Sequence, residues 1–442
     1  MAQTERPKML FADDQGRIYD HPYMEMAGFD GRGNVLPRRE DLTDLPEFSK
    51  LFFLPGRPPV GYDPRSGKMR VVEEVKLGKR RIRCHAVAAF PEPGYARTLL
   101  PAARYTSKGP MLPLWAYTAV GMDESGFCAS AFLVEHNPAW DPRNYDDRDL
   151  MSALERMEAR EGTNPLLDHV RNCAVNNHCF AAKNLFLKRW EAPLPVSRTC
   201  NARCLGCLSR QEEGSSCVAS HDRISFRPTV GNVLDLAVPH LEGAENAIVS
   251  FGQGCEGEPL TESKLIAESV SAMRRQTSKG TINLNTNGSW PDRVAGIMDA
   301  GLDSIRISLN SARSDLYHAY YRPKGYSFQD VVSSLKLSVE RQRFTMINYL
   351  IFPGITDDEA EIQALEQLLR DTGGHFVHFK NLCIDPGLYL NHMPRSNQKA
   401  VGIRTAYERI RDAFPGLTIG YFNKTVTDAG EPVEGRGRLA LS

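Results

Sequence analysis

The pattern of hydrophobic and polar residues changes near Trp190. Upstream, short apolar runs are separated by Pro- and Gly-rich stretches, which is typical of short strands and irregular loops. Residues 147–188 are helical in composition. Downstream of Pro193, short apolar runs alternate with amphipathic stretches, as expected where strands alternate with helices.

The second part predicts six strands and five helices. The strands are expected at 193–198, 247–251, 281–285, 304–309, 344–352 and 376–384, and the helices at 230–241, 261–276, 291–299, 327–342 and 357–371. Thr356 and Glu359 form an expected capping box at the start of the last helix. Six such units predict a parallel sheet curled into a partial barrel, because a full eight-unit barrel takes about 250 residues.

The predicted fold class is therefore α/β, a partial (β/α)6 TIM-like barrel with an N-terminal α+β accessory region. The expected division is a β-rich accessory region at 1–145, a helical connector at 146–190 and the barrel at 191–385. Residues 386–442 are expected to close the barrel, together with the N-terminal region.

Charge and hydropathy narrow the choice of partners. The 54 basic and 54 acidic residues cancel, so no overall field favours nucleic acid or anionic lipid. Met1 to Leu10 lack the apolar core of a signal peptide, and no run of eighteen apolar residues predicts a membrane span. A cytoplasmic location is expected, where ten cysteines indicate metal or redox chemistry more than disulfides.

Three of these cysteines, Cys200, Cys204 and Cys207, form a C-x3-C-x2-C run directly after the first predicted barrel strand. Such a loop can bring three thiolates to one face of an iron–sulfur cube, leaving one iron open for another ligand. A structural zinc site with Cys217 or His221 as fourth ligand is the alternative.

The triplet and its position resemble the cluster motif of the radical S-adenosylmethionine (SAM) superfamily. The resemblance implies a 4Fe–4S cluster on the three cysteines, with SAM chelated by the open iron. It also implies reductive cleavage of SAM and abstraction of a hydrogen atom from a substrate by a 5′-deoxyadenosyl radical. One departure is Gly206, where the family often has an aromatic residue before the third cysteine.

Later strand ends extend the resemblance. Gly257 and Glu258 stand in a segment similar to the family's Gly-Gly-Glu-Pro, which contacts the methionine amino group of SAM. Thr286 belongs to a Thr-Asn-Gly step similar to one that faces SAM. Ser308 lies in an Ile-Ser-Leu-Asn step that looks like a family strand whose serine approaches the SAM carboxylate or ribose. These four residues are the expected cofactor contacts.

The sequence says less about the roles of the other cysteines. Cys383 ends the sixth strand, where its thiol could return a hydrogen atom to a product radical. Cys173 and Cys179 are expected to be buried free thiols, and Cys255 to fill space. No cysteine follows Cys383, which argues against an auxiliary cluster in the C-terminal segment and against the molybdenum-cofactor cyclase reaction.

The sequence thus predicts a radical SAM enzyme acting on an unknown small molecule or peptide, with an electron donor such as ferredoxin or flavodoxin. One alternative is a radical SAM methylase or RNA modifier, favoured if Cys383 is essential. Another is a zinc-stabilised binding protein without catalysis.

Overall fold

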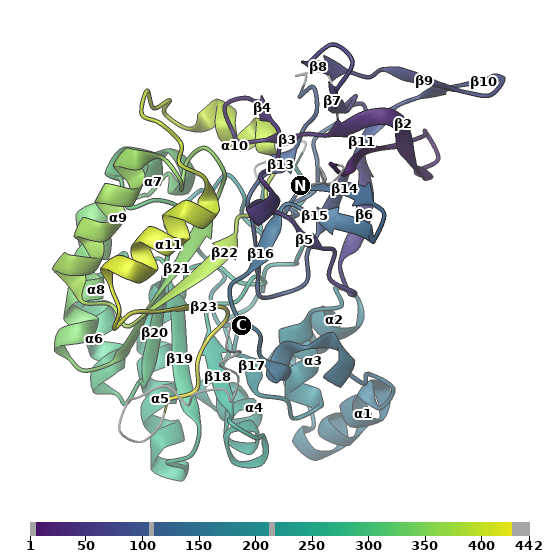
Figure 1. Ribbon diagram of the computed structural model, residues 1–442. Helices are drawn as coiled ribbons and strands as arrows, with labels where there is room; N and C mark the ends of the chain where they lie inside the picture. The colour runs from purple at the N-terminus through teal and green to yellow at the C-terminus, as the bar shows by residue number, and fades with distance from the viewer. Residues whose placement is uncertain (1–5, 106–109, 212–216, 427–442) are drawn as a thin grey trace.

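The computed structural model describes residues 6–105, 110–211 and 217–426. An antiparallel β region and three helices precede a parallel α/β sheet (Figure 1). Part of the expected closing segment, residues 427–442, lies outside the described residues. No helix of the described part is both long and apolar enough to cross a bilayer.

The N-terminal region is built on a nine-stranded antiparallel sheet. Its strands are β1 (Lys8–Ala12), β2 (Ile18–Met26), β5 (Thr43–Asp44), β6 (Lys50–Leu54), β7 (Val60–Asp63), β8 (Lys68–Val71), β11 (His85–Phe90), β14 (Thr118–Asp123) and β15 (Gly126–Ala129). Smaller pairings are made by β9 (Glu74–Leu77) with β10 (Arg80–Arg83), by β12 (Tyr95–Arg97) with β16 (Ala131–Leu133), and by β3 (Gly28–Phe29) with β4 (Asn34–Val35) and β13 (Leu100–Pro101). Helices α1 (Leu150–Glu161), α2 (Pro165–Val175) and α3 (Phe180–Phe186) follow, as the composition predicted.

The second part is a seven-stranded parallel sheet whose strands follow chain order. They are β17 (Glu191–Pro193), β18 (Ile248–Phe251), β19 (Thr281–Thr286), β20 (Ser304–Leu309), β21 (Phe344–Ile351), β22 (Phe376–Asn381) and β23 (Thr418–Gly420). The helices are α4 (Val230–Gly243), α5 (Ser263–Gln276), α6 (Pro291–Asp299), α7 (Ser314–Tyr321), α8 (Phe328–Glu340), α9 (Glu359–Thr372), α10 (Pro386–His392) and α11 (Ile403–Ala413). The α/β class is confirmed, and the sheet has one strand more than the six expected.

Alternation along the strands separates two environments. On β20, the fully buried Ile305, Ile307 and Leu309 belong to the main hydrophobic core with residues of the surrounding helices. Arg306 and Ser308 point to the opposite face, because successive side chains of a strand alternate. The sheet curls around this second face, which is the interior of a partial barrel, and helices cover its outer face (Figure 1).

The two edges of the sheet are not paired with each other among the described strands, and side chains bridge them instead. Asn423, just after β23, donates from Nδ2 to Glu191 Oε1 of β17 at 2.6 Å. Near the amino ends of the strands, Phe344, Met346 and Phe376 form an apolar cluster. The interior is therefore closed by apolar packing at that end, and its polar part lies toward the carboxyl ends.

The N-terminal region packs on the carboxyl ends of β21 and β22. Arg97, at the end of β12, is fully buried and donates from Nη2 to the Leu382 carbonyl at 2.8 Å. Its guanidinium carbon lies 4.9 Å from the centroid of the Phe352 ring. Burial lowers the pKa of Arg97 to about 10, which leaves it charged near neutral pH. This packing places the N-terminal region against the carboxyl ends of two barrel strands.

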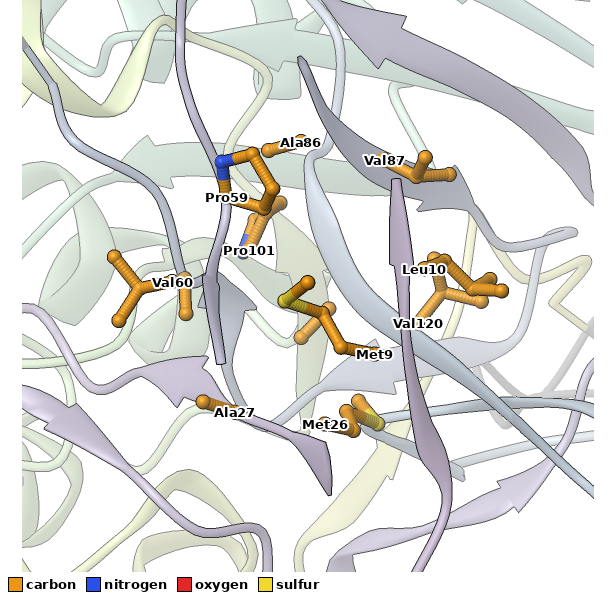
Figure 2. A pocket seen from close by; sticks show the side chains of 12 residues that line it. Met9, Leu10, Met26, Ala27, Pro59, Val60, Ala86, Val87, Pro101 and Val120 are labelled. Carbon is orange, nitrogen blue, oxygen red and sulfur yellow. The ribbon is translucent and has the colours of Figure 1, made fainter. Parts of the chain in front are cut away.

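A small cavity lies inside the N-terminal region, between strands of the antiparallel sheet. Figure 2 shows Met9 and Met26 beside it, together with Val60 and Val87. Its volume is about 10 Å³, close to the space of one water molecule, and its lining side chains are apolar. This volume is far smaller than that of a ligand pocket.

One local prediction is wrong. Helix α9 is capped by Asp358, whose carboxylate accepts from the Ala360 N–H at 3.0 Å. The hydroxyl of Thr356 instead accepts from the Phe352 N–H at 2.8 Å. The Thr356 hydroxyl therefore stabilises the turn after β21, and Asp358 is the residue that caps the helix.

Candidate active site

The cysteine loop follows β17 and is held by a helix that the sequence did not predict. The N–H of Leu205 donates to the Tyr320 carbonyl at 3.0 Å, and the N–H of Arg203 donates to the Tyr321 carbonyl at 2.9 Å. Both carbonyls belong to the last turn of α7, where helix carbonyls lack partners within the helix. Helix α7 therefore fixes the loop through its backbone.

The loop is also tied to the end of β19. Asn201 donates from Nδ2 to Ser289 Oγ at 2.8 Å and accepts from Asn287 Nδ2 at 2.8 Å. All three side chains are buried. The residue after the first cysteine thus connects this loop to the third strand of the sheet.

The three cysteine sulfurs do not converge as ligands of a single ion do. Around a tetrahedral zinc, thiolate sulfurs lie about 3.8 Å apart. Within the described part of the chain, the one group of three metal-type ligand atoms within 4.8 Å of one another does not include Cys200, Cys204 or Cys207. At least one pair of the three cysteine sulfurs is therefore more than 4.8 Å apart, further than two thiolates on one zinc ion.

Burial controls the protonation of two of these thiols. It raises the pKa of Cys200 to about 11 and that of Cys204 well above its usual value. Without metal both are therefore neutral thiols, and binding a cluster releases their protons.

A cation lies beside the third thiol. Arg223 donates from Nη2 to Cys207 Sγ at 3.5 Å and from Nε to Ser209 Oγ at 3.0 Å. The Ser209 hydroxyl in turn donates to the Glu256 carbonyl at 2.9 Å. The sequence offered no signal for Arg223, since it stands in a loop sixteen residues after Cys207.

The space beside Gly206 is occupied. A Cβ added there would lie 3.1 Å from the Tyr320 hydroxyl and 3.4 Å from the Cys383 carbonyl. A large side chain at this position would displace α7 or the segment after β22. The departure from the family pattern is thus matched by an aromatic residue of α7 in the same space.

Two buried glutamates organise the loop after β18. Glu256 accepts from the N–H groups of Val196, Ser197, Gly252 and Gln253, at 2.7–2.9 Å. These four bonds use all the acceptor positions of a carboxylate. Glu256 therefore holds the extension of β17 against this loop and has none left for a ligand.

Glu258 has a different set of partners. Its Oε1 accepts from the Thr286 hydroxyl and from the Leu260 N–H, and its Oε2 accepts from the Asn287 N–H at 2.9 Å. One acceptor position of Oε2 has no donor among the described residues. Burial raises the pKa of Glu258 to about 7. The structure thus brings two expected cofactor residues, Glu258 and Thr286, into direct contact.

The glycines of this loop are required by neighbouring backbone. A Cβ on Gly257 would lie 1.9 Å from the Thr199 carbonyl oxygen, and one on Gly252 would lie 1.8 Å from the Asn285 carbonyl oxygen. Glycine is therefore needed at both positions because neighbouring backbone comes too close for a side chain, whether or not a ligand also binds there.

The interior face holds polar atoms without partners. Asn348 of β21 donates from Nδ2 to Ser308 Oγ of β20 at 3.1 Å, and Arg306 contacts His378 Nδ1 at 3.3 Å. Buried atoms that lack a hydrogen-bond partner are Asn285 Nδ2, Arg306 Nε, Asn348 Oδ1 and His378 Nε2. Buried polar groups are normally paired, so this cluster is suited to a polar ligand.

Comparison with known families decides the nature of this site. Residues 194–365 match the sequence profile described as the radical SAM superfamily. The chain contains a radical SAM domain. The match begins just after β17 and ends in α9, so it contains the cysteine loop and both buried glutamates.

Curated relatives of this radical SAM protein are GTP 3′,8-cyclases. The protein from Streptomyces coelicolor is 28% identical over 261 residues, which is 58% of this chain and 67% of that protein. The protein from Corynebacterium glutamicum strain R is 28% identical over 204 residues, 44% of this chain and 50% of that protein. The chain thus spans about half to two thirds of the length of these relatives.

Solved radical SAM structures are similar at low identity. Methylornithine synthase (PylB) has 14% identity and a TM-score of 0.37, covering 63% of this chain and 76% of that one. Streptococcus suis SuiB bound to S-adenosylmethionine has 14% identity and a TM-score of 0.38, covering 64% and 62%.

The protein is accordingly an enzyme, and its radical SAM domain uses a 4Fe–4S cluster and SAM. The site fits both groups, because it offers three thiols in one fixed loop and an interior of unpartnered polar atoms. The expectation of a non-catalytic binding protein is wrong.

Proposed function

We propose that this radical SAM enzyme cleaves SAM reductively and abstracts a hydrogen atom from a small molecule that carries an anionic group. The observation that carries the proposal is a polar interior in which, among the described residues, Arg306 and Lys380 form no ion pair and share only the longer-range charge of Glu191. The cluster supplies one-electron reduction when bound, and SAM supplies the group that abstracts hydrogen.

Within this proposal Cys200, Cys204 and Cys207 hold the cluster. The free acceptor position of Glu258 receives the ammonium of SAM, since a carboxylate and an ammonium form a strong charge-assisted hydrogen bond. Thr286 positions Glu258 by donating to it. Gly257 keeps the loop against Thr199, and Ser308 presents its hydroxyl to the cofactor beside Asn348.

The interior cations define the substrate class. Among the described residues, neither Arg306 of β20 nor Lys380 of β22 forms an ion pair with a carboxylate, and burial lowers the pKa of both. A buried charge is costly unless it is paired. An anionic group of the substrate, a carboxylate or a phosphate, provides that pair. The electron donor in this proposal is a small redox protein such as ferredoxin or flavodoxin.

Cys383 is the residue on which the methylase alternative depends. Its carbonyl lies near Gly206, and its thiol donates to the Asn381 carbonyl at 3.7 Å. We assign it no step. A Cys383→Ala protein that still forms 5′-deoxyadenosine but releases no product would favour the alternative.

The first experiment tests the cluster ligands. Anaerobically reconstituted Cys204→Ala protein should lose its brown colour and its conversion of SAM to 5′-deoxyadenosine with a chemical reductant. Cys128→Ala removes a buried thiol of the N-terminal sheet and should retain both. Retention of colour and cleavage by Cys204→Ala would refute the assignment.

The second experiment tests the substrate class. A deuterated cell extract is fractionated on an anion exchanger, and each fraction is incubated with enzyme and SAM. Deuterium should enter 5′-deoxyadenosine only with retained, anionic fractions, and Arg306→Met should abolish the transfer while binding SAM normally. Transfer from unretained fractions would refute the anionic substrate, and GTP serves as a defined anionic probe because the relatives are GTP cyclases.

A further inference from the structure

Three potential metal ligands meet between helix α2 and the loop after β18. The ligand atoms of His169, Cys173 and Cys255 all lie within 4.8 Å of one another. The sequence predicts a buried free thiol at Cys173 and a space-filling role for Cys255, and both thiols are free and buried. It does not predict that the fold brings the two side chains together with His169.

The separations suit a single ion. His169 and Cys173 are four residues apart, on one face of α2, and His169 Nε2 lies 3.9 Å from Cys173 Sγ. Around tetrahedral zinc, a nitrogen and a sulfur ligand lie about 3.6 Å apart and two sulfurs about 3.8 Å. Shifts of at most about one ångström therefore produce a coordination shell.

The surroundings fit a soft metal ion. Cys173 and Cys255 are buried and His169 is half-buried, so one side is open to solvent. Thiolate and imidazole together select zinc over magnesium or calcium, which prefer oxygen.

His221 is the nearest further ligand. A Cβ added to Gly254, the residue before Cys255, would lie 3.8 Å from His221 Nδ1, and His221 interacts electrostatically with Cys173. Its segment is fixed beside the cysteine loop, because the His221 N–H donates to the Leu208 carbonyl at 2.9 Å. His221 Nδ1 now lies 3.0 Å from Ser220 Oγ, and binding an ion through this nitrogen requires that contact to break.

We propose that His169, Cys173 and Cys255 bind one zinc ion, with His221 completing a tetrahedral site. The site is structural and separate from the cysteine loop at Cys200. It joins α2 of the N-terminal part to the loop that carries Glu256, Gly257 and Glu258. Zinc at this point stabilises the loop whose backbone and carboxylates shape the active site, and the inference does not depend on which reaction the enzyme catalyses.

The test measures zinc and iron in the same full-length samples. Wild-type protein from zinc-supplemented cells, dialysed against a weak chelator, should hold one zinc per chain. Cys173→Ser and Cys255→Ser should lose at least nine tenths of it, and His169→Gln should weaken zinc binding at least tenfold. Cys128→Ser is the matched control, a buried thiol outside the group, and should keep its zinc.

Three further readouts make the result decisive. Cobalt(II) added to the zinc-free protein should give the visible absorption of a tetrahedral thiolate site in the wild type but not in Cys255→Ser. A Cys200/Cys204/Cys207→Ala protein should lose iron and keep zinc, which separates this site from the proposed cluster. A zinc-free wild type, zinc retained by Cys173→Ser, or a Cys173–Cys255 disulfide in peptide mapping would each overturn the proposal. His169→Gln, at a half-exposed position, covers the case in which the cysteine variants fail to fold.

Discussion

The guanidinium of Arg57 donates to the Asp385 carboxylate at 2.7 Å, and the two side chains are only 5% and 3% exposed. Arg57 belongs to the N-terminal region, and Asp385 follows β22 and caps α10 by accepting from the Gly387 N–H at 2.7 Å. The same carboxylate accepts from the Leu112 N–H at 3.0 Å. One buried carboxylate therefore joins the N-terminal region to the carboxyl end of the sixth barrel strand.

Replacing Arg57 by Met should destabilise the protein by about 3–5 kcal/mol, because it leaves a buried carboxylate without its counter-ion. The measurement is chemical denaturation of cofactor-free protein. The control is Arg104→Met, since the Arg104–Glu73 pair is largely exposed and such pairs contribute about 1 kcal/mol or less. If the two variants lost similar free energies of unfolding, the buried pair would contribute no more to stability than the exposed pair.

Gly257→Ala should be severely destabilising or leave the loop displaced, at a cost of about 3 kcal/mol or more. The reason is steric, because the new Cβ would lie 1.9 Å from the Thr199 carbonyl oxygen. Gly254→Ala in the same loop is the control, since its Cβ meets nothing nearer than 3.5 Å. Unfolding free energies of both variants decide the point, and equal values would contradict the geometry.

Much of the parallel sheet could be predicted, because its strands carry a strong local signal. The residues expected for the fourth strand, 304–309, are those of β20, and 291–299 are those of α6. Strand β23 could not be predicted, since three residues at the sheet edge have too little apolar pattern. Helix α7, eight residues long and rich in tyrosine, carries little helical pattern either.

In the candidate site too, some features could be predicted from the sequence and others could not. Cys200, Cys204 and Cys207 are close in sequence, so their spacing carries the information. The contact of Arg223 with Cys207 and the meeting of Cys173 with Cys255 depend on how loops cross in three dimensions, for which one sequence has no periodic signal. The contact of Thr286 with Glu258 was implied by resemblance of both segments to one family, without its geometry.

Arg223→Met should make the midpoint potential of the cluster more negative. Reduction adds negative charge, and the Arg223 guanidinium stabilises it by donating to Cys207 Sγ. A loss of about 1.4 kcal/mol, as for a charged hydrogen bond, corresponds to about 60 mV for one electron. Arg203→Met removes an exposed charge of the same loop and should shift the potential by less than half as much. Potentiometric titration followed by EPR measures both, and an unchanged potential in Arg223→Met would exclude the role.

SAM binding should depend on the protonation of Glu258. Burial raises its pKa to about 7, so at pH 5 the free protein carries a neutral carboxyl at this position. The ammonium of SAM requires the carboxylate, and below pH 7 binding must therefore release a proton. The affinity for SAM should fall by up to about tenfold per pH unit from pH 7 to pH 5 and be level just above pH 7.

Glu258→Gln tests this dependence by removing the titration. The variant should bind SAM about 10–100-fold more weakly at pH 8, the loss of a charged hydrogen bond, and should show no slope between pH 5 and pH 7. Glu361→Gln is the matched control, because burial also raises the pKa of Glu361 to about 7. Glu361 accepts from the Tyr349 hydroxyl and the Ala312 N–H, away from the loop, so its replacement should keep the slope. Equilibrium binding of SAM to reconstituted protein gives both results, and a slope that survives in Glu258→Gln would assign the titrating group elsewhere.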